Sequence, residues 1–192
     1  MMKIYLASQS PRRKELLELM DVSFDILPMD IPEVTHPNET PEAYSTRITK
    51  EKLQAGWAHV LDHQLPHRPV LCADTEVVLD GKIYGKPKDY TDAFEMLRSY
   101  SGKTHDVLTS VGLKYGTYEK IVVHHTAVTF GAMTDHDIEH YLAKGDYQDK
   151  SGGYAIQSYI GQFVSRIDGC FYAIRGLPLH VVHELLAEVE HV

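Results

Sequence analysis

The chain has 192 residues, of which 43% are hydrophobic and 24% charged, and its formal net charge at pH 7 is −8. This length suits a single domain over residues 1–192 with a sizeable core. The negative balance argues against a broad nucleic-acid-binding face, which needs a basic surface, but it leaves room for a small anionic ligand that a few converging cations can hold.

The sequence shows no membrane or secretion signal. No apolar stretch approaches the roughly 20 residues that a membrane helix needs, and no signal-peptide pattern accompanies the first apolar run. Cys72 and Cys170 lie far apart and have no zinc-type spacing, so we expect two buried free thiols in a reducing compartment. The expectation is therefore a cytoplasmic protein that binds neither a membrane nor nucleic acid.

The chain begins with a short strand at residues 4–7 that leads into a polar segment at 8–13. Ser10 is a favoured N-cap residue and Pro11 suits the first helical position, so an amphipathic helix is expected to begin there. The free N–H groups of its first turn can hold a phosphate. The side chains that would join them are Ser8, Arg12 and Arg13. An ordinary capped helix with solvated arginines explains the same pattern.

Periodicity and turn residues predict the following elements up to the middle of the chain. They are a strand at 23–28, a polar loop at 29–42, a long helix from Pro41 to about His59, a buried strand at 69–73 that stops at Asp74–Thr75, a hairpin turning at Asp80–Gly81, a loop at 85–89 and a helix at 91–100.

The second half is predicted to contain two long antiparallel strands, a helix, a polar loop, a last hairpin and a closing helix. Their ranges are 104–114, 120–130, 134–144, 145–153, 163–174 around Asp168–Gly169, and 178–189. This mixture indicates an α/β or α+β fold with a mixed sheet. A smaller lobe at about 91–143 is one division of the chain. Because ligand sites favour such boundaries, we expect a cleft between the two lobes.

Asp74 is the first candidate for chemistry. A carboxylate at the end of a buried strand occupies the place where ligands bind in open α/β sheets. There it can ligate a hard cation or take a proton from a water molecule. Glu33, in the acidic loop, is a candidate for a second metal or water ligand. The alternatives are a capping role for Asp74 and a solvated Glu33.

Several other polar residues suit a nucleotide. Lys86 lies on a stiffened loop between Gly85 and Pro87, and it would form a positive field with Lys52 and the two arginines at the chain start. Gln157 offers both a donor and an acceptor, which match the adjacent carbonyl and N–H of uracil or thymine. Taken singly, an exposed lysine and an exposed glutamine are the commoner findings.

Other familiar motifs are excluded. His136 and His140 have helical spacing, but the glutamate that follows the first histidine of a zinc protease is missing. Neither a Walker-type phosphate loop nor a dinucleotide-binding glycine motif occurs.

Taken together and in this order, a set of short motifs resembles the Maf family of nucleotide pyrophosphatases over nearly the whole length. The motifs are Ser8-Gln9-Ser10-Pro11-Arg12-Arg13, Ala73-Asp74-Thr75, Gly85-Lys86-Pro87, Ser101-Gly102-Lys103-Thr104-His105, Asp149 through Gln157, and Gly176-Leu177-Pro178-Leu179. The resemblance implies an elongated mixed central β-sheet flanked by helices, with two lobes and a cleft between them. The family is often dimeric, so a homodimer is one state to test.

The resemblance also implies hydrolysis of a nucleoside triphosphate to the monophosphate and pyrophosphate with a divalent metal cation, Mg²⁺ or Mn²⁺. Matched by motif, the implied roles are proton acceptor for Asp74; substrate specificity for Arg12, Thr75 and Gln157; phosphate binding for Ser8, Arg13, Lys52 and Lys86; and metal binding for Glu33 and Asp74.

The Ala-Asp-Thr form with Gln157 downstream resembles the branch that acts on dTTP and UTP. The alternatives are the branch that acts on 7-methyl-GTP and a nucleotide-sensing regulator of cell division. The chain departs from the family pattern at Glu76, where an apolar residue is usual, and at Ser151, where alanine is usual. Glu76 is either an extra metal ligand or a solvated side chain.

Overall fold

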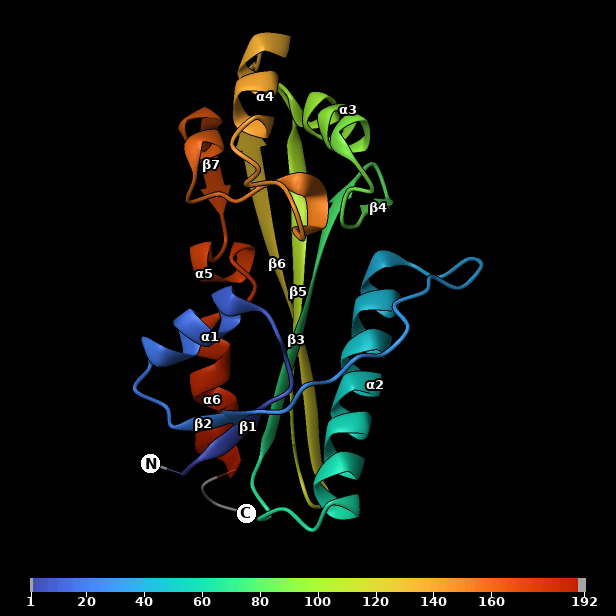
Figure 1. Ribbon diagram of the computed structural model, residues 1–192, viewed down its shortest axis with the longest axis vertical. Coiled ribbons are helices and arrows are strands. Elements are labelled where there is room, and N and C mark those ends of the chain that lie inside the picture. Colours follow the sequence, from blue (N-terminus) through green and yellow to red (C-terminus); the bar gives the residue numbers. More distant parts are fainter. Residues whose placement is uncertain (1, 190–192) are drawn as a thin grey trace. The chain divides into compact units, whose positions relative to one another are not determined.

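The computed structural model describes residues 2–189 (Figure 1). In chain order the elements are β1 (Ile4–Leu6), α1 (Pro11–Glu18), β2 (Phe24–Ile26), α2 (Pro41–Asp62), β3 (Val70–Leu79), β4 (Lys82–Tyr84), α3 (Tyr90–Tyr100), β5 (Thr104–Tyr115), β6 (Tyr118–Phe130), α4 (Asp135–Leu142), β7 (Val164–Asp168), α5 (Phe171–Ile174) and α6 (Leu179–Val189), with short 3₁₀ helices at Ser151–Gly153 and Tyr159–Phe163.

The strands form one seven-stranded sheet of mixed direction. Its order is β2-β1-β3-β5-β6-β7, and β4 pairs with β3 off this path. Strand β1 runs parallel to β2 and β3, whereas β4 is antiparallel to β3 and β7 is antiparallel to β6. The predicted α/β fold with a mixed central sheet flanked by helices is therefore confirmed.

The chain divides into two compact units. Unit 1 comprises Met1–Asp74, Thr109–His124 and Gly176–Val192, and unit 2 comprises Thr75–Leu108 and His125–Arg175. Unit 2 differs from the lobe suggested at about 91–143, because the turn between β5 and β6 belongs to unit 1 and unit 2 continues to Arg175. The cleft expected between two lobes stays a prediction.

In unit 1, helices cover both faces of β1 and β3. Leu6 and Leu71 belong to a buried cluster with α1 and α6, whereas their neighbours Tyr5 and Cys72 belong to a second cluster with Leu53 of α2. This alternation follows from the two-residue period of a strand. Figure 1 shows α1 and α6 on one side of these strands and α2 on the other.

The core of unit 2 is rich in aromatic side chains. Tyr100 of α3, Phe130 of β6 and Tyr141 of α4 are completely or almost completely buried there, together with Tyr154. Aromatic rings of this size account for much of the apolar surface that a small unit can bury.

Strand β3 does not end where the sequence pattern suggested. The prediction of a strand that stops at Asp74–Thr75 is wrong, because β3 continues without interruption from Val70 to Leu79. Asp74 and Glu76 are both buried within it. Polar residues usually mark the end of a buried strand, but a counter-charge from elsewhere in the chain allows a carboxylate to lie inside one.

The predicted last hairpin is also wrong in its second half. Strand β7 forms, but the residues after Gly169 form helix α5. Gly169 has a φ of +133°, and the N–H of Cys170 donates to Thr126 Oγ1 at 3.1 Å. These features redirect the chain, although the aromatic and β-branched residues that follow favour a strand.

Several local predictions are confirmed. Strands β3 and β4 pair around Asp80 and Gly81, whose φ values of 53° and 76° match a type I′ turn. Helix α1 begins at Pro11 with Ser10 at the N-cap position, although the Ser10 side chain makes no capping bond. In the described part of the chain, no helix combines the length and apolar character needed to cross a membrane.

Candidate functional site

An ion pair between α2 and β3 is the centre of the candidate site in unit 1. Because strand residues alternate, Asp74 lies on the same face of β3 as Cys72, which packs with α2. Lys52 of α2 meets Asp74 on this face, with its Nζ 2.7 Å from Asp74 Oδ1. The two side chains are only 12% and 6% exposed, respectively. The lysine thus supplies the counter-charge that a buried carboxylate requires.

Glu33 joins this pair from the irregular segment before α2. Its Oε1 lies 2.6 Å from Lys52 Nζ, so one ammonium group connects two carboxylates. Burial and the nearby charge of Arg13 oppose protonation of Lys52, but the charge of Asp74 and the hydrogen bonds that Lys52 donates to both carboxylates raise its pKa above the ordinary value. Lys52 is therefore a cation at neutral pH and can attract a phosphate.

The segment before α1 adds a second cation. Arg13 donates from Nε to the carbonyl oxygen of Gly176 at 3.0 Å and from Nη1 to Ser8 Oγ at 3.3 Å. The Ser8 hydroxyl also accepts the backbone N–H of Ser10 at 3.2 Å. Because the charge of Arg13 acts on Lys52, these residues share one electrostatic neighbourhood. Arg12 is half-buried in the first turn of α1.

The cysteine nearest to these charges is not a nucleophile. Cys72 is fully buried and its thiol donates to the carbonyl oxygen of Thr49 at 3.3 Å. Burial raises the pKa of the thiol to about 12, against the opposing influence of Lys52 and Arg13. Since the thiolate is the reactive form, Cys72 is not a candidate nucleophile.

One oxygen of Asp74 has no partner in the described structure. This atom, Oδ2, is buried. A buried polar atom without a partner is uncommon and calls for a ligand, a water molecule or an ion. Within residues 2–189 no three His, Cys, Asp or Glu side chains gather as a ready-made metal site. A cation would thus rely on Asp74 and Glu33, with further oxygens from a ligand and from water, as Mg²⁺ sites commonly do.

The remaining predicted residues belong to unit 2. Thr75 is half-buried on the face of β3 opposite to Asp74, while Lys86 and Gln157 are exposed. The loop with Lys86 and the segment with Gln157 are joined, because the N–H of Gly152 donates to the carbonyl oxygen of Gly85 at 2.9 Å.

The backbone of this segment depends on glycine. Gly152 has a φ of +73°, and a Cβ there would lie 2.4 Å from Cγ2 of Val77. Only glycine suits both this conformation and this close approach.

Sequence reasoning missed two polar pairs beside these residues. Arg47 of α2 forms an ion pair with Glu39, 2.7 Å from Nε to Oε1, and His105 Nε2 lies 2.7 Å from the hydroxyl of Tyr154. No local pattern reveals either contact, because it joins residues from different elements. For His105 and Tyr154 the signal was their presence in the motifs, without an indication that they meet.

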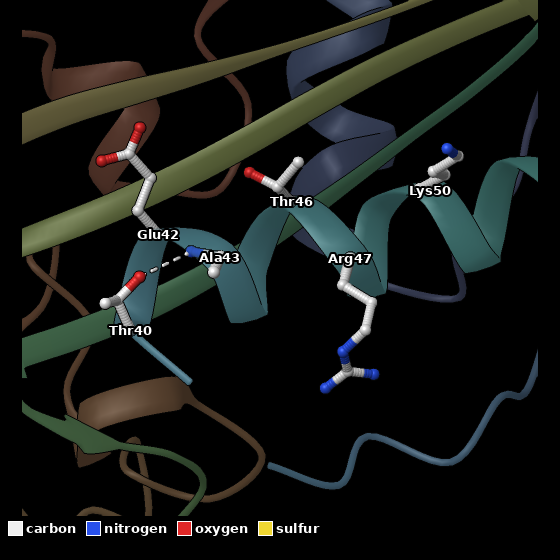
Figure 2. Close-up of a pocket in the computed structure, with 6 residues that line it drawn as sticks. All are labelled: Thr40, Glu42, Ala43, Thr46, Arg47 and Lys50. Atoms are coloured by element: carbon white, nitrogen blue, oxygen red, sulfur yellow. Dashed lines mark hydrogen bonds between the residues drawn. The ribbon is translucent and has the colours of Figure 1, made fainter. Parts of the chain in front are cut away.

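A surface hollow of about 540 Å³ lies at the start of α2 (Figure 2). The residues that line it are Thr40, Glu42, Ala43, Thr46, Arg47 and Lys50. Thr40 Oγ1 caps the helix by accepting the N–H of Ala43 at 3.2 Å. None of the side chains that the sequence assigns to phosphate, metal or base lines this hollow.

Comparisons with known proteins agree with the fold and with the motifs. The family model described as Maf-like protein matches residues 3–189. The dTTP/UTP pyrophosphatase of Chromobacterium violaceum is 44% identical over 97% of this chain and 94% of that protein. The protein of the same name from Aliivibrio fischeri is 44% identical over 96% of each chain. The solved structure of the Staphylococcus aureus Ham1 protein has a similar fold, with a TM-score of 0.52 at 12% identity over 97% of this chain and 98% of that chain. This chain belongs to the Maf family.

Proposed function

We propose that this protein is a pyrophosphatase that hydrolyses dTTP and UTP to the monophosphate and pyrophosphate. The observation that carries the proposal is the position of Lys52 between two carboxylates, one of which keeps a buried oxygen without a partner. The relatives named dTTP/UTP pyrophosphatase, at 42–44% identity over nearly the full length, support the choice of substrate.

In the proposed reaction a water molecule attacks the α-phosphorus. Asp74 accepts the water proton at Oδ2, while its Oδ1 stays bound to Lys52. The bond to the β-phosphate oxygen breaks, and pyrophosphate leaves with the electron pair. A positioned general base typically contributes 10²–10⁴-fold to the rate.

Cations hold the triphosphate and stabilise the charge that develops on pyrophosphate. The cations assigned to this role are Arg13, Lys52 and Lys86, and the Ser8 hydroxyl is assigned to phosphate binding as a neutral partner. At about 4 Å and an effective dielectric constant near 20, each cation–phosphate pair contributes about 4 kcal/mol before desolvation. Binding of an anion by an acidic protein is therefore governed by these few local charges.

The carboxylates suit a hard divalent cation. Glu33 and the Asp74 carboxylate would hold Mg²⁺ or Mn²⁺ together with phosphate oxygens and water. When bound, such an ion neutralises charge on the phosphate oxygens.

Selection of the base falls to Arg12, Thr75 and Gln157. The amide of Gln157 can donate to a pyrimidine carbonyl and accept the adjacent N–H. We also propose that the protein works in the cytoplasm, where its free thiols stay reduced, and that it forms a homodimer, which light scattering would test.

The test is a panel of nucleoside triphosphates with pyrophosphate release as the readout, in the presence of Mg²⁺ or Mn²⁺. We expect dTTP and UTP to be the preferred substrates. Preference for 7-methyl-GTP would identify the other branch of the family. Tight binding with negligible turnover, together with little loss in an Asp74→Asn variant, would identify a nucleotide-sensing regulator. No turnover of any triphosphate by folded protein would overturn the proposal.

A further inference from the structure

The segment that carries Glu33 has no regular structure of its own. Residues 27–40, between β2 and α2, form neither a helix nor a strand. Fixing each residue of such a segment costs conformational entropy. A Glu33 carboxylate that stays at Lys52 therefore needs other contacts to hold its backbone.

Arg47 supplies these contacts from the second turn of α2. Its Nε and Nη2 donate to the two carboxylate oxygens of Glu39 at 2.7 and 2.8 Å, and Nη2 also donates to the carbonyl oxygen of Val34 at 2.8 Å. Figure 2 shows the Arg47 side chain extending from the opposite side of the helix to Glu42. One guanidinium group thus grips the segment at two places.

The ion pair between Arg47 and Glu39 is partly shielded from water. The side chains of Arg47 and Glu39 are 22% and 10% exposed, respectively. The hydrogen bond from Arg47 lowers the pKa of Glu39 to about 2, and Glu39 raises the pKa of Arg47. Glu39 Oε2 also accepts the N–H of His36 at 3.1 Å, which closes the turn between them. Bidentate arginine–carboxylate pairs of this kind combine strength with fixed geometry.

The grip is adjacent to the candidate metal ligand. Val34 follows Glu33 directly, so the hydrogen bond to its carbonyl oxygen restrains the chain next to Glu33. The Glu33 side chain then reaches Lys52, which lies on the same helix as Arg47, about 7.5 Å further along the helix axis. Two cations of one rigid helix thus hold the backbone and the side chain of the same short stretch.

We propose that Arg47 is a positioning residue that holds the Glu33 carboxylate beside Asp74 for the divalent cation, by fastening Val34 and Glu39 to α2. The inference rests on the proposed function, in which Glu33 is a metal ligand. It goes beyond that function because Arg47 need not touch substrate or metal. Arg47 would affect metal binding only by positioning Glu33. Its effect on Mn²⁺ affinity should therefore disappear when Glu33 is replaced.

The experiment is a double-mutant cycle of Arg47→Gln and Glu33→Gln, with Mn²⁺ titrated both in the assay and in calorimetry without nucleotide. Removing a residue that orients a metal ligand typically weakens metal affinity about 10- to 100-fold. We expect R47Q to raise the Mn²⁺ concentration for half-maximal pyrophosphate release about tenfold, while kcat at saturating Mn²⁺ stays within about twofold. In the E33Q background, R47Q should add no further shift.

Two further variants separate positioning from stability. Glu51→Gln removes the other carboxylate partner of Arg47, at 3.1 Å, without touching the segment, so its Mn²⁺ response should match the wild type. Arg47→Lys keeps the charge but cannot make the bidentate contact of a guanidinium group. Its Mn²⁺ affinity should therefore lie between those of R47Q and the wild type. Hydrogen exchange should become faster at residues 33–39 in R47Q and stay unchanged in E51Q. Should R47Q fail to fold, Glu39→Gln and R47K take its place in the cycle.

The proposal would be overturned if the effects of R47Q and E33Q on the half-maximal Mn²⁺ concentration multiplied in the double variant. It would also be overturned if hydrogen exchange at residues 33–39 were unchanged in R47Q. An E33Q variant with wild-type Mn²⁺ binding would also overturn it, because nothing would then pass through Glu33. Failure of the proposed function looks different: the wild type would release no pyrophosphate from any triphosphate. Calorimetry with Mn²⁺ alone would still decide the role of Arg47.

Discussion

Lys52 in unit 1 and His105 in unit 2 are both titratable side chains shielded from water, yet the structure treats their charges in opposite ways. Lys52 lies between Asp74 and Glu33, and these carboxylates raise its pKa despite the burial. His105 is 2% exposed and shares a hydrogen bond with the neutral hydroxyl of Tyr154. Burial lowers the pKa of His105 to about 4.

This difference distinguishes Lys52, a residue of the candidate site, from His105, a residue that supports the fold. A buried charge is costly, so a cation kept in place by two carboxylates is retained where chemistry can use it. A buried histidine without a counter-charge is neutral, and its ring packs against Tyr100 and Phe130 with centroid distances of 4.7 and 5.3 Å. His105 thus anchors Tyr154, three residues before Gln157.

The first test concerns the charged cluster formed by Lys52, Asp74 and Glu33. Replacement of Asp74 should have the largest effect. The amide of Asp74→Asn cannot accept a proton, so we expect kcat for pyrophosphate release from UTP to fall about 10³-fold. Steady-state assays at pH 7.5 measure this, and Glu18→Gln, an exposed carboxylate on α1, is the matched control. Unchanged turnover in D74N would remove Asp74 from the reaction and with it the contrast between the clusters.

The neutral cluster is formed by His105, Tyr154, Tyr100 and Phe130. It is tested by lowering the pH. The pKa of His105 falls from 6.5 in the unfolded chain to about 4 in the folded one, so the unfolded state binds more protons in this interval. Stability is therefore complete above pH 6.5 and is lost as the pH falls toward 4, by about 3 kcal/mol for this one group. Urea unfolding at pH 7.5 and 4.5 measures the loss, and His105→Asn should lack this share of it.

A matched variant keeps the packing of this cluster nearly intact. Tyr154→Phe removes only the hydroxyl that meets His105, so we expect a loss of about 1 kcal/mol at pH 7.5 with the pH dependence retained. An equal loss on acidification in the wild type and in H105N would show that His105 is not held neutral.

The glycine segment beside the neutral cluster should give the next effect. Gly152→Ala places a methyl group against Val77 in a left-handed conformation, so we expect a loss of about 3 kcal/mol in urea unfolding. Gly145→Ala is the control in the same unit. Gly145 has a φ of +76° with nothing within 4 Å of a Cβ, so it should lose only about 1 kcal/mol. Equal losses would mean that backbone strain alone matters and that the approach of Val77 does not.

The two clusters also show what could be predicted from the sequence. Helices and hairpin turns such as Asp80–Gly81 follow from local rules of period and turn chemistry, and they were placed correctly. The continuation of β3 through Asp74 and the helix after Gly169 were not, because each depends on a partner distant in the chain. Local patterns cannot reveal such partners.

The candidate site shows the same limit. The family resemblance assigned Lys52 to phosphate, Glu33 to metal, and Asp74 to proton transfer and metal, among nine residues in all, and the structure brings these three together. Arg47 and Glu39 belong to no motif, and their ion pair depends on how a segment without helix or strand folds back on α2. Contacts of this kind are seen only in three dimensions.

Gln157 tests whether the neutral scaffold serves selectivity and should give the smallest effect. The residue is exposed in the turn after Tyr154, so Gln157→Glu should leave the free energy of unfolding within about 0.5 kcal/mol of wild type. If Gln157 reads the nucleobase as proposed, the change replaces a donor by an acceptor facing a pyrimidine carbonyl, which should lower kcat/KM for UTP and dTTP about tenfold. Turnover of inorganic tripolyphosphate, which has no nucleobase, is the control and should change far less.

Two outcomes would contradict this role. If the variant lowers turnover of UTP and of tripolyphosphate equally, it acts through the charge of the site, and unchanged selectivity among the triphosphates would remove Gln157 from base recognition. Because Y154F disturbs the anchor without altering the amide, a smaller shift of the same selectivity in Y154F would tie the scaffold of unit 2 to the choice of base.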